Sequence, residues 1–386
     1  MSWAIVKLGD LYSVHNGLSK EGKFFGSGYP FLTFSTVFNN YFIPDVLNDL
    51  VQSTEKEQAN YSIKRGDIFV TRTSETSDEL GMSCVALKDY PCATYNGFTK
   101  RMRPLQEDRV LPEYIGYYMR MPSFRGEFKA FSTMTTRASL KNEDLLSLNV
   151  ALPPMGIQEK IAGILKNYDN LIANNQKQIE LLEEAAQRLY KKWFVDLRFP
   201  GYEDVKIVDG VPEGWKKELI GDLIRKGVRS KQVKTTEYLQ EGAIPIIDQS
   251  RDFIAGYTND PEAVVDMGCP IIVFGDHTRI LKYIQFPFAK GADGTQLITS
   301  NNDNMPQSLL YYSLVSVDLS SYHYARHFKY LKAENILVPT KEIAEKFDRY
   351  VSAILIQIQK MRDISKKSAE ARDRLLPKLM SGEIEV

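Results

Sequence analysis

Ile157-Gln158-Glu159-Lys160 begins a stretch that the chain repeats. The same stretch continues to Glu184-Ala185-Ala186-Gln187-Arg188-Leu189, and its repetition is the strongest indication of the fold. It returns as Ile343-Ala344-Glu345-Lys346 and Glu370-Ala371-Arg372-Asp373-Arg374-Leu375, with the same offset of 186 positions from 157 to 343 and from 189 to 375. Pro153, Ile172 and Lys192 recur at this offset as Pro339, Ile358 and Lys378. Because the offset is constant, the two copies predict two structural elements of equal length.

Both copies predict long helices, because apolar residues recur at alternating steps of three and four. About 40 residues at a rise of 1.5 Å each give a helix of roughly 60 Å, which is too long for one small domain to cover. We therefore expect the two helices to pack on each other as a coiled coil; the alternative is that each lies on a separate core. Pro377 is expected to end or kink the second helix near Leu376. The predicted interface residues are Ile161, Ile164, Tyr168, Leu171, Asn175, Leu182, Leu189, Phe347, Tyr350, Ile354, Met361, Ile364 and Leu375.

Each helix follows a module, and the two modules are similar in size but different in amino-acid sequence. Module 1 covers residues 1 to about 152, and module 2 covers residues 200 to about 338. In module 1, alternation and β-branched or aromatic residues predict strands at 29–34, 63–71 and 83–87, and a short helix is expected at 111–119. The same order returns in module 2. Each module ends in a similar short sequence, and we align Leu140–Leu146 of module 1 with Leu331–Leu337 of module 2. Turn residues at 199–215 predict the hinge between the two halves.

Composition limits the class of protein. The chain has 386 residues, 43% of them hydrophobic and 25% charged, which is typical of a folded two-domain protein. Three cysteines without metal spacing, no signal peptide and no long apolar run predict a cytoplasmic protein. The formal net charge of zero is mild evidence against tight DNA binding by the chain alone, because Lys and Arg carry phosphate binding.

Motifs for catalysis are missing from the sequence. The Pro-Pro of Leu152-Pro153-Pro154-Met155 lacks the polar first residue and aromatic last residue of an adenine-methyltransferase tetrapeptide. Phe24 stands where the phosphate-loop motif requires Ser or Thr in the segment 17–24. His323 and His327 are four apart, as metal ligands on one helix face are, but no third ligand has a sensible spacing. We therefore expect a non-catalytic protein without cofactor or metal.

Taken together, these motifs resemble the DNA-specificity (S) subunit of type I restriction–modification systems over essentially the whole chain. The most specific parts are 152–165, Trp193-Phe194-Val195-Asp196, Pro212-Glu213-Gly214-Trp215 and 374–382. The second helix departs from the first, with Ala344-Glu345-Lys346-Phe347 in place of Gln158-Glu159-Lys160-Ile161.

The resemblance implies an α+β fold with two β-rich target-recognition domains separated by two long helices in an antiparallel coiled coil, with pseudo-twofold symmetry. The implied boundaries are 1–152 for target-recognition domain 1, 153–198 for conserved helix 1, 199–338 for target-recognition domain 2 and 339–386 for conserved helix 2. It implies that each domain reads one half of a bipartite double-stranded DNA site. The helices would set the spacer and dock two adenine-methyltransferase (modification) subunits, which restriction/translocase subunits join.

DNA contacts are expected in the polar loops that differ between the modules, since loops on a β scaffold commonly carry specificity. Arg and Asn suit base edges, Thr and Lys suit phosphates, and an aromatic ring is able to stack or wedge. The alternative is that these loops are simply solvated. The candidates are Lys23, Thr71, Arg72, Thr73, Ser74, Asn96, Lys100, Arg101 and Arg137 in module 1, and Gln249, Arg251, His277, Thr278, Arg279, Lys290, Tyr322, His323, Arg326 and Lys329 in module 2.

Two other interpretations remain open at this point. The first is a stand-alone nuclease or modification enzyme, whose active site would lack the known sequence motifs. A coiled-coil scaffold that does not bind DNA accounts for the helices but not for two long, divergent β-rich modules.

Overall fold

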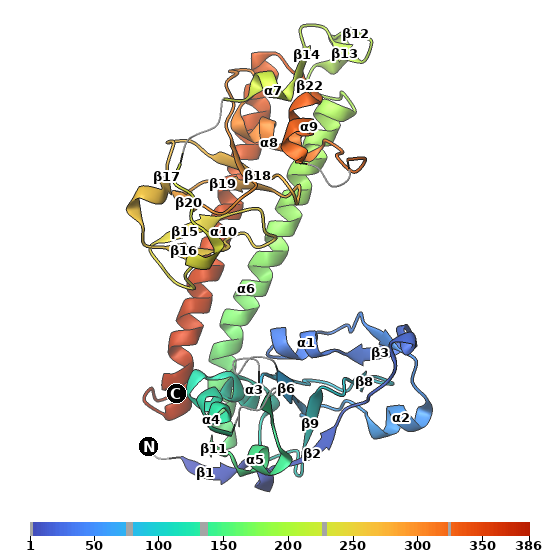
Figure 1. Cartoon of the computed structure of the whole chain (residues 1–386), viewed down its shortest axis with the longest axis vertical. Helices are drawn as coiled ribbons and strands as arrows, with labels where there is room; N and C mark the ends of the chain where they lie inside the picture. The colour runs from blue at the N-terminus through green and yellow to red at the C-terminus, as the bar shows by residue number, and fades with distance from the viewer. Residues whose placement is uncertain (1–2, 75–79, 132–137, 226–229, 323–325) are drawn as a thin grey trace. The chain divides into compact units, whose positions relative to one another are not determined.

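The computed structural model describes residues 3–74, 80–131, 138–225, 230–322 and 326–386 (Figure 1). The chain divides into two compact units. Unit 1 comprises Met1–Ala173 and Lys366–Val386, and unit 2 comprises Asn174–Ser365. Each unit therefore contains one module together with a part of each long helix. The boundaries between the units fall inside the two helices, whereas the domains expected from the sequence end where the helices begin.

The two long helices are α6 (Met155–Tyr190), with 36 residues, and α10 (Lys341–Ser381), with 41 residues. A π-helical turn, Lys191–Val195, extends α6. Helix α10 runs through Pro377, so the expected end near Leu376 is wrong. Leu376, Leu379 and Met380 are buried in the core of unit 1, and this burial offsets the backbone hydrogen bond that a proline cannot donate.

Module 1 is built on a four-stranded sheet of order β2-β9-β5-β7 and a three-stranded sheet of order β4-β3-β8. Strand β1 pairs with β11, and β6 pairs with β10. The elements are β1 (Ala4–Lys7), η1 (Leu8–Asp10), β2 (Tyr12–Asn16), η2 (Gly22–Phe24), β3 (Phe25–Leu32), α1 (Phe34–Asn39), β4 (Leu50–Val51), α2 (Glu55–Asn60), β5 (Ile68–Thr71), β6 (Thr73–Ser74), β7 (Ser83–Val85), β8 (Thr94–Tyr95), β9 (Thr99–Pro104), α3 (Pro112–Arg120), α4 (Pro122–Phe131), β10 (Ala138–Ser139), α5 (Asn142–Ser147) and β11 (Asn149–Leu152).

Module 2 is built on a three-stranded sheet of order β19-β18-β21 and a four-stranded sheet of order β16-β15-β20-β17. Strand β14 pairs with β22, and β12 pairs with β13. The elements are η5 (Tyr202–Asp204), β12 (Ile207–Val208), β13 (Val211–Pro212), β14 (Lys216–Leu219), α7 (Ile220–Leu223), η6 (Thr235–Glu237), β15 (Ile244–Ile247), β16 (Gly256–Thr258), η7 (Pro261–Ala263), β17 (Val264–Val265), β18 (Ile271–Gly275), β19 (Leu281–Ile284), β20 (Phe288–Lys290), β21 (Thr295–Ile298), α8 (Gln307–Val315), α9 (His327–Ala333) and β22 (Asn335–Val338).

The two modules share several strand pairings, although their corresponding sheets differ in the number of strands. In each, a buried strand lies between two antiparallel neighbours, β5 between β7 and β9 and β18 between β19 and β21. In each, one pair of strands is parallel, β3 with β8 and β15 with β20. In each, a strand near the start of the module pairs antiparallel with the last strand, β1 with β11 and β14 with β22. The repeated order that the sequence suggested is therefore a repeated fold.

The predicted alignment of Leu140–Leu146 with Leu331–Leu337 is wrong by five residues. The Leu8 N–H donates to Leu148 O (2.8 Å), and the Ile220 N–H donates to Glu334 O (2.9 Å). Leu148 therefore corresponds to Glu334, at the offset of 186 that the helices show, and Leu145 corresponds to the equally buried Leu331. The similar residues at an offset of 191 were misleading, because strand pairing rather than residue identity fixes which residues of the two modules correspond.

The helices pair in an antiparallel sense within unit 2, because rising numbers in α6 meet falling numbers in α10. Asn175 Nδ2 donates to Ser365 Oγ (3.2 Å), and Glu183 pairs with Arg362 (2.7 Å). The ring of Tyr190 lies 6.2 Å from that of Phe347. In unit 1, Ile161 and Leu165 of α6 share a core with Leu376 and Leu379 of α10.

The buried stripe of each helix differs in part from the expected one. Leu171 and Ile364, which were predicted as interface residues, are 41% and 46% exposed. Leu165, Ile179 and Ala186, which lie beside the predicted positions on the surface of α6, are buried. Each helix also packs on a module, so its buried face is broader than the seam of a coiled coil. Ile161, Asn175, Phe347 and Met361 are buried, Ile164, Tyr168, Leu182, Leu189, Ile354 and Leu375 are partly buried, and the exposed Tyr350 lies 6.3 Å from Trp193 between ring centroids.

Candidate nucleic-acid interface

Four loops of module 2 meet at the C-terminal end of β18. We call residues 248–252, 275–279, 291–294 and 319–328, as far as they are described, the module 2 loop cluster. The Asp276 N–H donates to Gly294 O (2.7 Å), and the Asp276 carboxylate accepts the Phe328 N–H (2.8 Å). Gln249 accepts the His277 N–H through Oε1 (3.1 Å) and donates through Nε2 to Asp293 O (2.9 Å). Loops distant in sequence therefore form one hydrogen-bonded surface.

Two glycines permit this close packing. A Cβ on Gly275 would lie 2.2 Å from Thr278 Oγ1, and a Cβ on Gly294 would lie 2.8 Å from a carbon of the His277 ring. Gly294 also has φ of +85°, a conformation that disfavours other residues. The loops are thus held in one shape from which the neighbouring polar side chains project.

The predicted residues of module 2 fall into two groups. His277, Thr278 and Arg279 are exposed, although Thr278 donates its hydroxyl proton to Gln249 O (2.7 Å) and Arg279 donates to Leu319 O (3.0 Å). Lys290 and Tyr322 are half-buried: burial lowers the pKa of Lys290, and the Tyr322 ring stacks on Tyr330 at 4.1 Å between centroids. Arg251, Arg326 and Lys329 are exposed, and His323 lies outside the described residues.

Module 1 forms a corresponding cluster, which we define as residues 17–19, 71–74, 95–99 and 138–142 and call the module 1 loop cluster. The Arg72 N–H donates to Phe98 O and the Leu140 N–H donates to Arg72 O, both at 3.0 Å. The Leu18 N–H donates to Tyr95 O (2.8 Å). Thr73 and Ser74 belong to β6, which pairs with β10. The cluster again lies at the end of the central strand of the sheet, here β5.

Three predicted residues of module 1 are buried. The Thr71 hydroxyl accepts the Met82 N–H (2.9 Å), Lys100 donates to the Asn142 side chain, and Arg101 donates to Ser62 O (2.7 Å). These side chains therefore brace the module in this conformation rather than face solvent. The physical reason is that β5 and β9 are adjacent central strands of one sheet, so position next to a loop did not imply exposure.

The remaining candidates of module 1 differ in exposure. Arg72 is half-buried, and its Nε finds no hydrogen-bond partner among the described residues. Asn96 accepts the Phe98 N–H through its side chain (2.7 Å) and so shapes a turn. Lys23 is exposed and pairs with Glu21 (2.7 Å). Arg137 lies outside the described residues.

Two residues that sequence reasoning missed stand out. Asp276 is buried and links three segments of its cluster through its carboxylate and backbone. Phe98 is 57% exposed at the tip of its loop. The Asn96-Gly97 pair was a usable signal for Phe98, because this dipeptide favours a tight turn that leaves the next side chain at the surface.

Within the described residues, no group of three His, Cys, Asp or Glu side chains has a geometry suited to a metal ion. Both ring nitrogens of His327 lie near backbone carbonyl oxygens, of Asp276 (2.9 Å) and Tyr322 (3.0 Å). In the same part of the chain, no helix combines the length and apolar character needed to cross a membrane.

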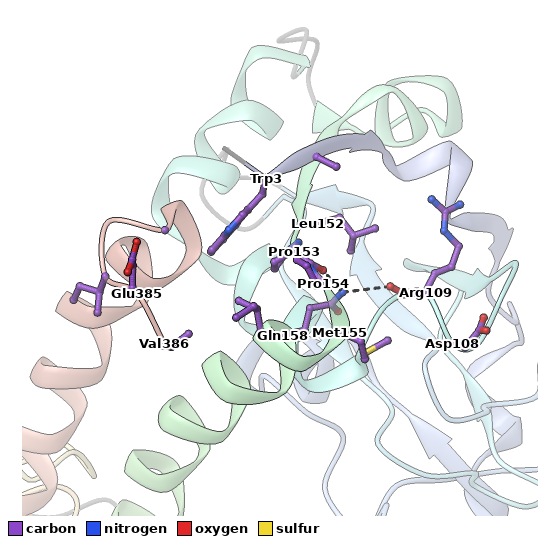
Figure 2. A pocket seen from close by; sticks show the side chains of 14 residues that line it. Trp3, Asp108, Arg109, Leu152, Pro153, Pro154, Met155, Gln158, Glu385 and Val386 are labelled. Atoms are coloured by element: carbon purple, nitrogen blue, oxygen red, sulfur yellow. Dashed lines mark hydrogen bonds between the residues drawn. The ribbon is translucent and has the colours of Figure 1, made fainter. Parts of the chain in front are cut away.

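A separate hollow of about 650 Å³ lies in unit 1 between β1, the start of α6 and the residues after α10 (Figure 2). Trp3, Pro154, Met155 and Val386 line it. Gln158 is buried beside it, where its side chain accepts the Leu111 N–H (2.8 Å) and donates to Pro153 O (2.9 Å). This residue of the 152–165 motif therefore joins the start of α6 to the start of α3.

Comparisons with known proteins point in one direction. The family described as type I restriction modification DNA specificity domain matches residues 1–184. The specificity subunit of the type I restriction enzyme MjaIX of Methanocaldococcus jannaschii is 26% identical, over 100% of this chain and 94% of that protein. The EcoR124I/EcoR124II specificity subunit of Escherichia coli is 30% identical over 26% of this chain and 24% of its own length. The crystal structure of the type I restriction–modification S subunit from M. genitalium superposes with a TM-score of 0.59 at 15% identity, covering 98% of this chain and 96% of that one.

Proposed function

Because the chain belongs to the family of DNA-specificity subunits of type I restriction–modification systems, we propose that it reads a bipartite target, with one half-site per module. It is a non-catalytic subunit of such a complex. The observation that carries the proposal is the repetition of one β scaffold with two different loop clusters. A shared scaffold with unlike loops suits the recognition of two unlike DNA sequences, because loops on a rigid frame vary without loss of the core.

The distance between the half-sites follows from the helices in this proposal. Helix α6 has 36 residues, which at a rise of 1.5 Å per residue is a length of about 54 Å. A spacer of fixed length and unspecified sequence is the expected consequence.

The helices also dock the two methyltransferase subunits in this proposal, and restriction/translocase subunits join that core. Exposed apolar side chains on otherwise charged helices support it, among them Leu171 and Leu181 on α6 and Ile356 and Ile364 on α10. Such side chains offer apolar surface that a partner subunit would cover. The net charge of zero also supports assembly, since other subunits would then supply the cations that hold the phosphates.

Mapping of methylated adenines tests the bipartite target. The chain would be expressed with the methyltransferase subunit of its own system in a host that lacks adenine methylation. We expect methylation at a two-part motif with an unspecified spacer of one length, dependent on the presence of this chain. A single continuous motif, or the same methylation without this chain, would refute the proposal.

Substitution of one arginine in each cluster tests the assignment of half-sites. Arg72→Ala and Arg279→Ala are each expected to weaken recognition of one half-site only, by about 1–3 kcal/mol for a lost base contact. The readout is binding of the assembled complex to duplexes altered in one half-site at a time. Arg65→Ala is the matched control, because Arg65 precedes β5 at the end opposite to Arg72. Unchanged discrimination at both half-sites in both variants would contradict this placement.

A further inference from the structure

Phe98 presents an aromatic ring to solvent from a loop whose backbone is held on both sides. Its N–H donates to Asn96 Oδ1 (2.7 Å), and its carbonyl accepts the Arg72 N–H (3.0 Å). The side chain is nevertheless 57% exposed. Because both backbone groups are satisfied, the segment that carries the ring is held in place.

The rest of this loop is tightly packed. A Cβ on Gly97 would lie 2.2 Å from Ser19 Oγ and 3.1 Å from Leu18 O. Thr99 donates its hydroxyl proton to Asn96 O (2.7 Å). The neighbouring side chains are thus engaged within the module, whereas the most apolar side chain of the tip projects outward. Because the ring is 57% exposed, the loop forgoes part of the about 1.5–3 kcal/mol that full burial of the ring would contribute.

Two cationic residues, Arg72 and Lys100, lie next to Phe98 in this part of the module. Arg72 adjoins Phe98 through the backbone hydrogen bond, and Lys100 lies two residues further along. Burial lowers the pKa of Lys100, and the positive charge of Arg72 lowers it further. The carboxylate of Asp144 acts on Lys100 in the opposite direction. Two cations against one carboxylate leave this end of the module positive, which favours an approaching polyanion, and the half-buried Arg72 is the more accessible of the two cations.

Module 2 offers a direct comparison. The Asp276 N–H donates to Gly294 O (2.7 Å) as the Arg72 N–H does to Phe98 O, and Thr295 donates to Ala292 O as Thr99 does to Asn96 O. Gly294 therefore holds the position of Phe98, and the buried Asp276 holds that of Arg72. The second cluster has neither the ring nor the cation at the equivalent place.

We propose that Phe98 is a wedge that enters the DNA of half-site 1 and partly unstacks one base step, a contact that half-site 2 does not receive. The inference rests on the proposed function, because it assigns one half-site to each module. Inserted apolar side chains unstack base steps in other DNA complexes, and stacking of a base on an aromatic ring contributes about 1–3 kcal/mol. Specificity at such a step arises from how easily that step deforms as well as from direct contacts.

The experiment uses the complex of this chain with its methyltransferase subunits and duplexes that carry 2-aminopurine at successive positions of either half-site. The methylated adenines and their immediate neighbours are left unlabelled, because methyltransferases extrude their target base from the duplex. With the wild-type chain, we expect fluorescence to rise at one step of half-site 1 and at no step of half-site 2. Phe98→Ala is expected to abolish that rise and to weaken binding about 5- to 150-fold. Phe98→Leu keeps an apolar wedge and is expected to retain part of both effects.

Val46→Ala is the matched control, because Val46 is an apolar residue of the same module, 69% exposed and outside the loop cluster. Thermal unfolding of each variant is expected to match that of the wild type, since the substituted side chains are exposed. If the wild-type complex binds both half-sites and no step of half-site 1 brightens, or if Phe98→Ala binds as tightly as Val46→Ala, the inference is overturned. If the wild-type complex shows no dependence on either half-site, it is the proposed function that fails.

Discussion

Replacement of Phe347 by alanine is expected to lower the free energy of unfolding by about 3–5 kcal/mol, the range for loss of a buried aromatic side chain. Phe347 is fully buried at the start of α10. Its ring centroid lies 5.0 Å from that of Phe194 and 5.8 Å from that of Trp193. Each such pair adds about 0.5–1.5 kcal/mol to the area that it buries. The cavity would open where the end of α6 meets the start of α10 within unit 2.

Denaturant unfolding of the purified chain measures this loss. Ile356→Ala is the control, because Ile356 belongs to the same helix and is 47% exposed. We expect the control to change the unfolding free energy by about 0.5 kcal/mol or less, as is usual for surface substitutions. Equal effects of the two substitutions would show that the aromatic cluster does not hold the helices of unit 2 together. Methylation by the assembled complex is expected to fall with Phe347→Ala at temperatures where the wild type remains active.

Replacement of Arg372 by alanine is expected to cost about 2–3 kcal/mol, less than for a fully buried pair because solvent reaches part of the site. Arg372 of α10 pairs with Asp169 of α6 at 2.5 Å, and Tyr117 of α3 donates its hydroxyl proton to the same carboxylate. The guanidinium lies 5.2 Å from the centroid of the Tyr41 ring. Burial alone would lower the pKa of Arg372, but its hydrogen bond to Asp169 raises the pKa above the usual value. The variant would leave Asp169 partly buried without its cation.

A double-mutant cycle with Asp169→Ala separates the pair from the packing. We expect a coupling energy of about 1–2 kcal/mol that decreases at high salt. Arg374→Ala is the control, because Arg374 is an exposed arginine in the same turn region of α10. Strictly additive effects of the Arg372 and Asp169 substitutions would rule out the pair as the contact that fixes module 1 on the helices.

Unit 2 repeats this kind of contact with different residues. Arg362 of α10 pairs with Glu183 of α6 at 2.7 Å and lies 4.1 Å from the centroid of the Phe253 ring. In both units an arginine of α10 therefore lies between a carboxylate of α6 and an aromatic ring of the module. The two contacts do not occupy positions related by the offset of 186, so the internal repeat gave no indication of them.

The surface residues of the candidate interface were predictable only in part. Arg279 and His277 are exposed as their loop position suggested, whereas Lys100 and Arg101 are buried although they belong to a predicted loop. Residue type and proximity to a turn are the same in both cases. The difference comes from segments packed over β9 from elsewhere in the chain, to which Lys100 and Arg101 donate hydrogen bonds.

The two long helices and the repeated order of the modules were predictable from the sequence, and its motifs carried the resemblance to specificity subunits. Helical periodicity and turn residues are local properties of the chain, and the constant offset follows from comparing its two halves. The tertiary structure alone decided which helix phase is buried, which loops converge and that Phe98 remains at the surface. These depend on pairs such as Arg72 with Phe98 and Asp276 with Gly294, since burial is set by segments that meet only after folding.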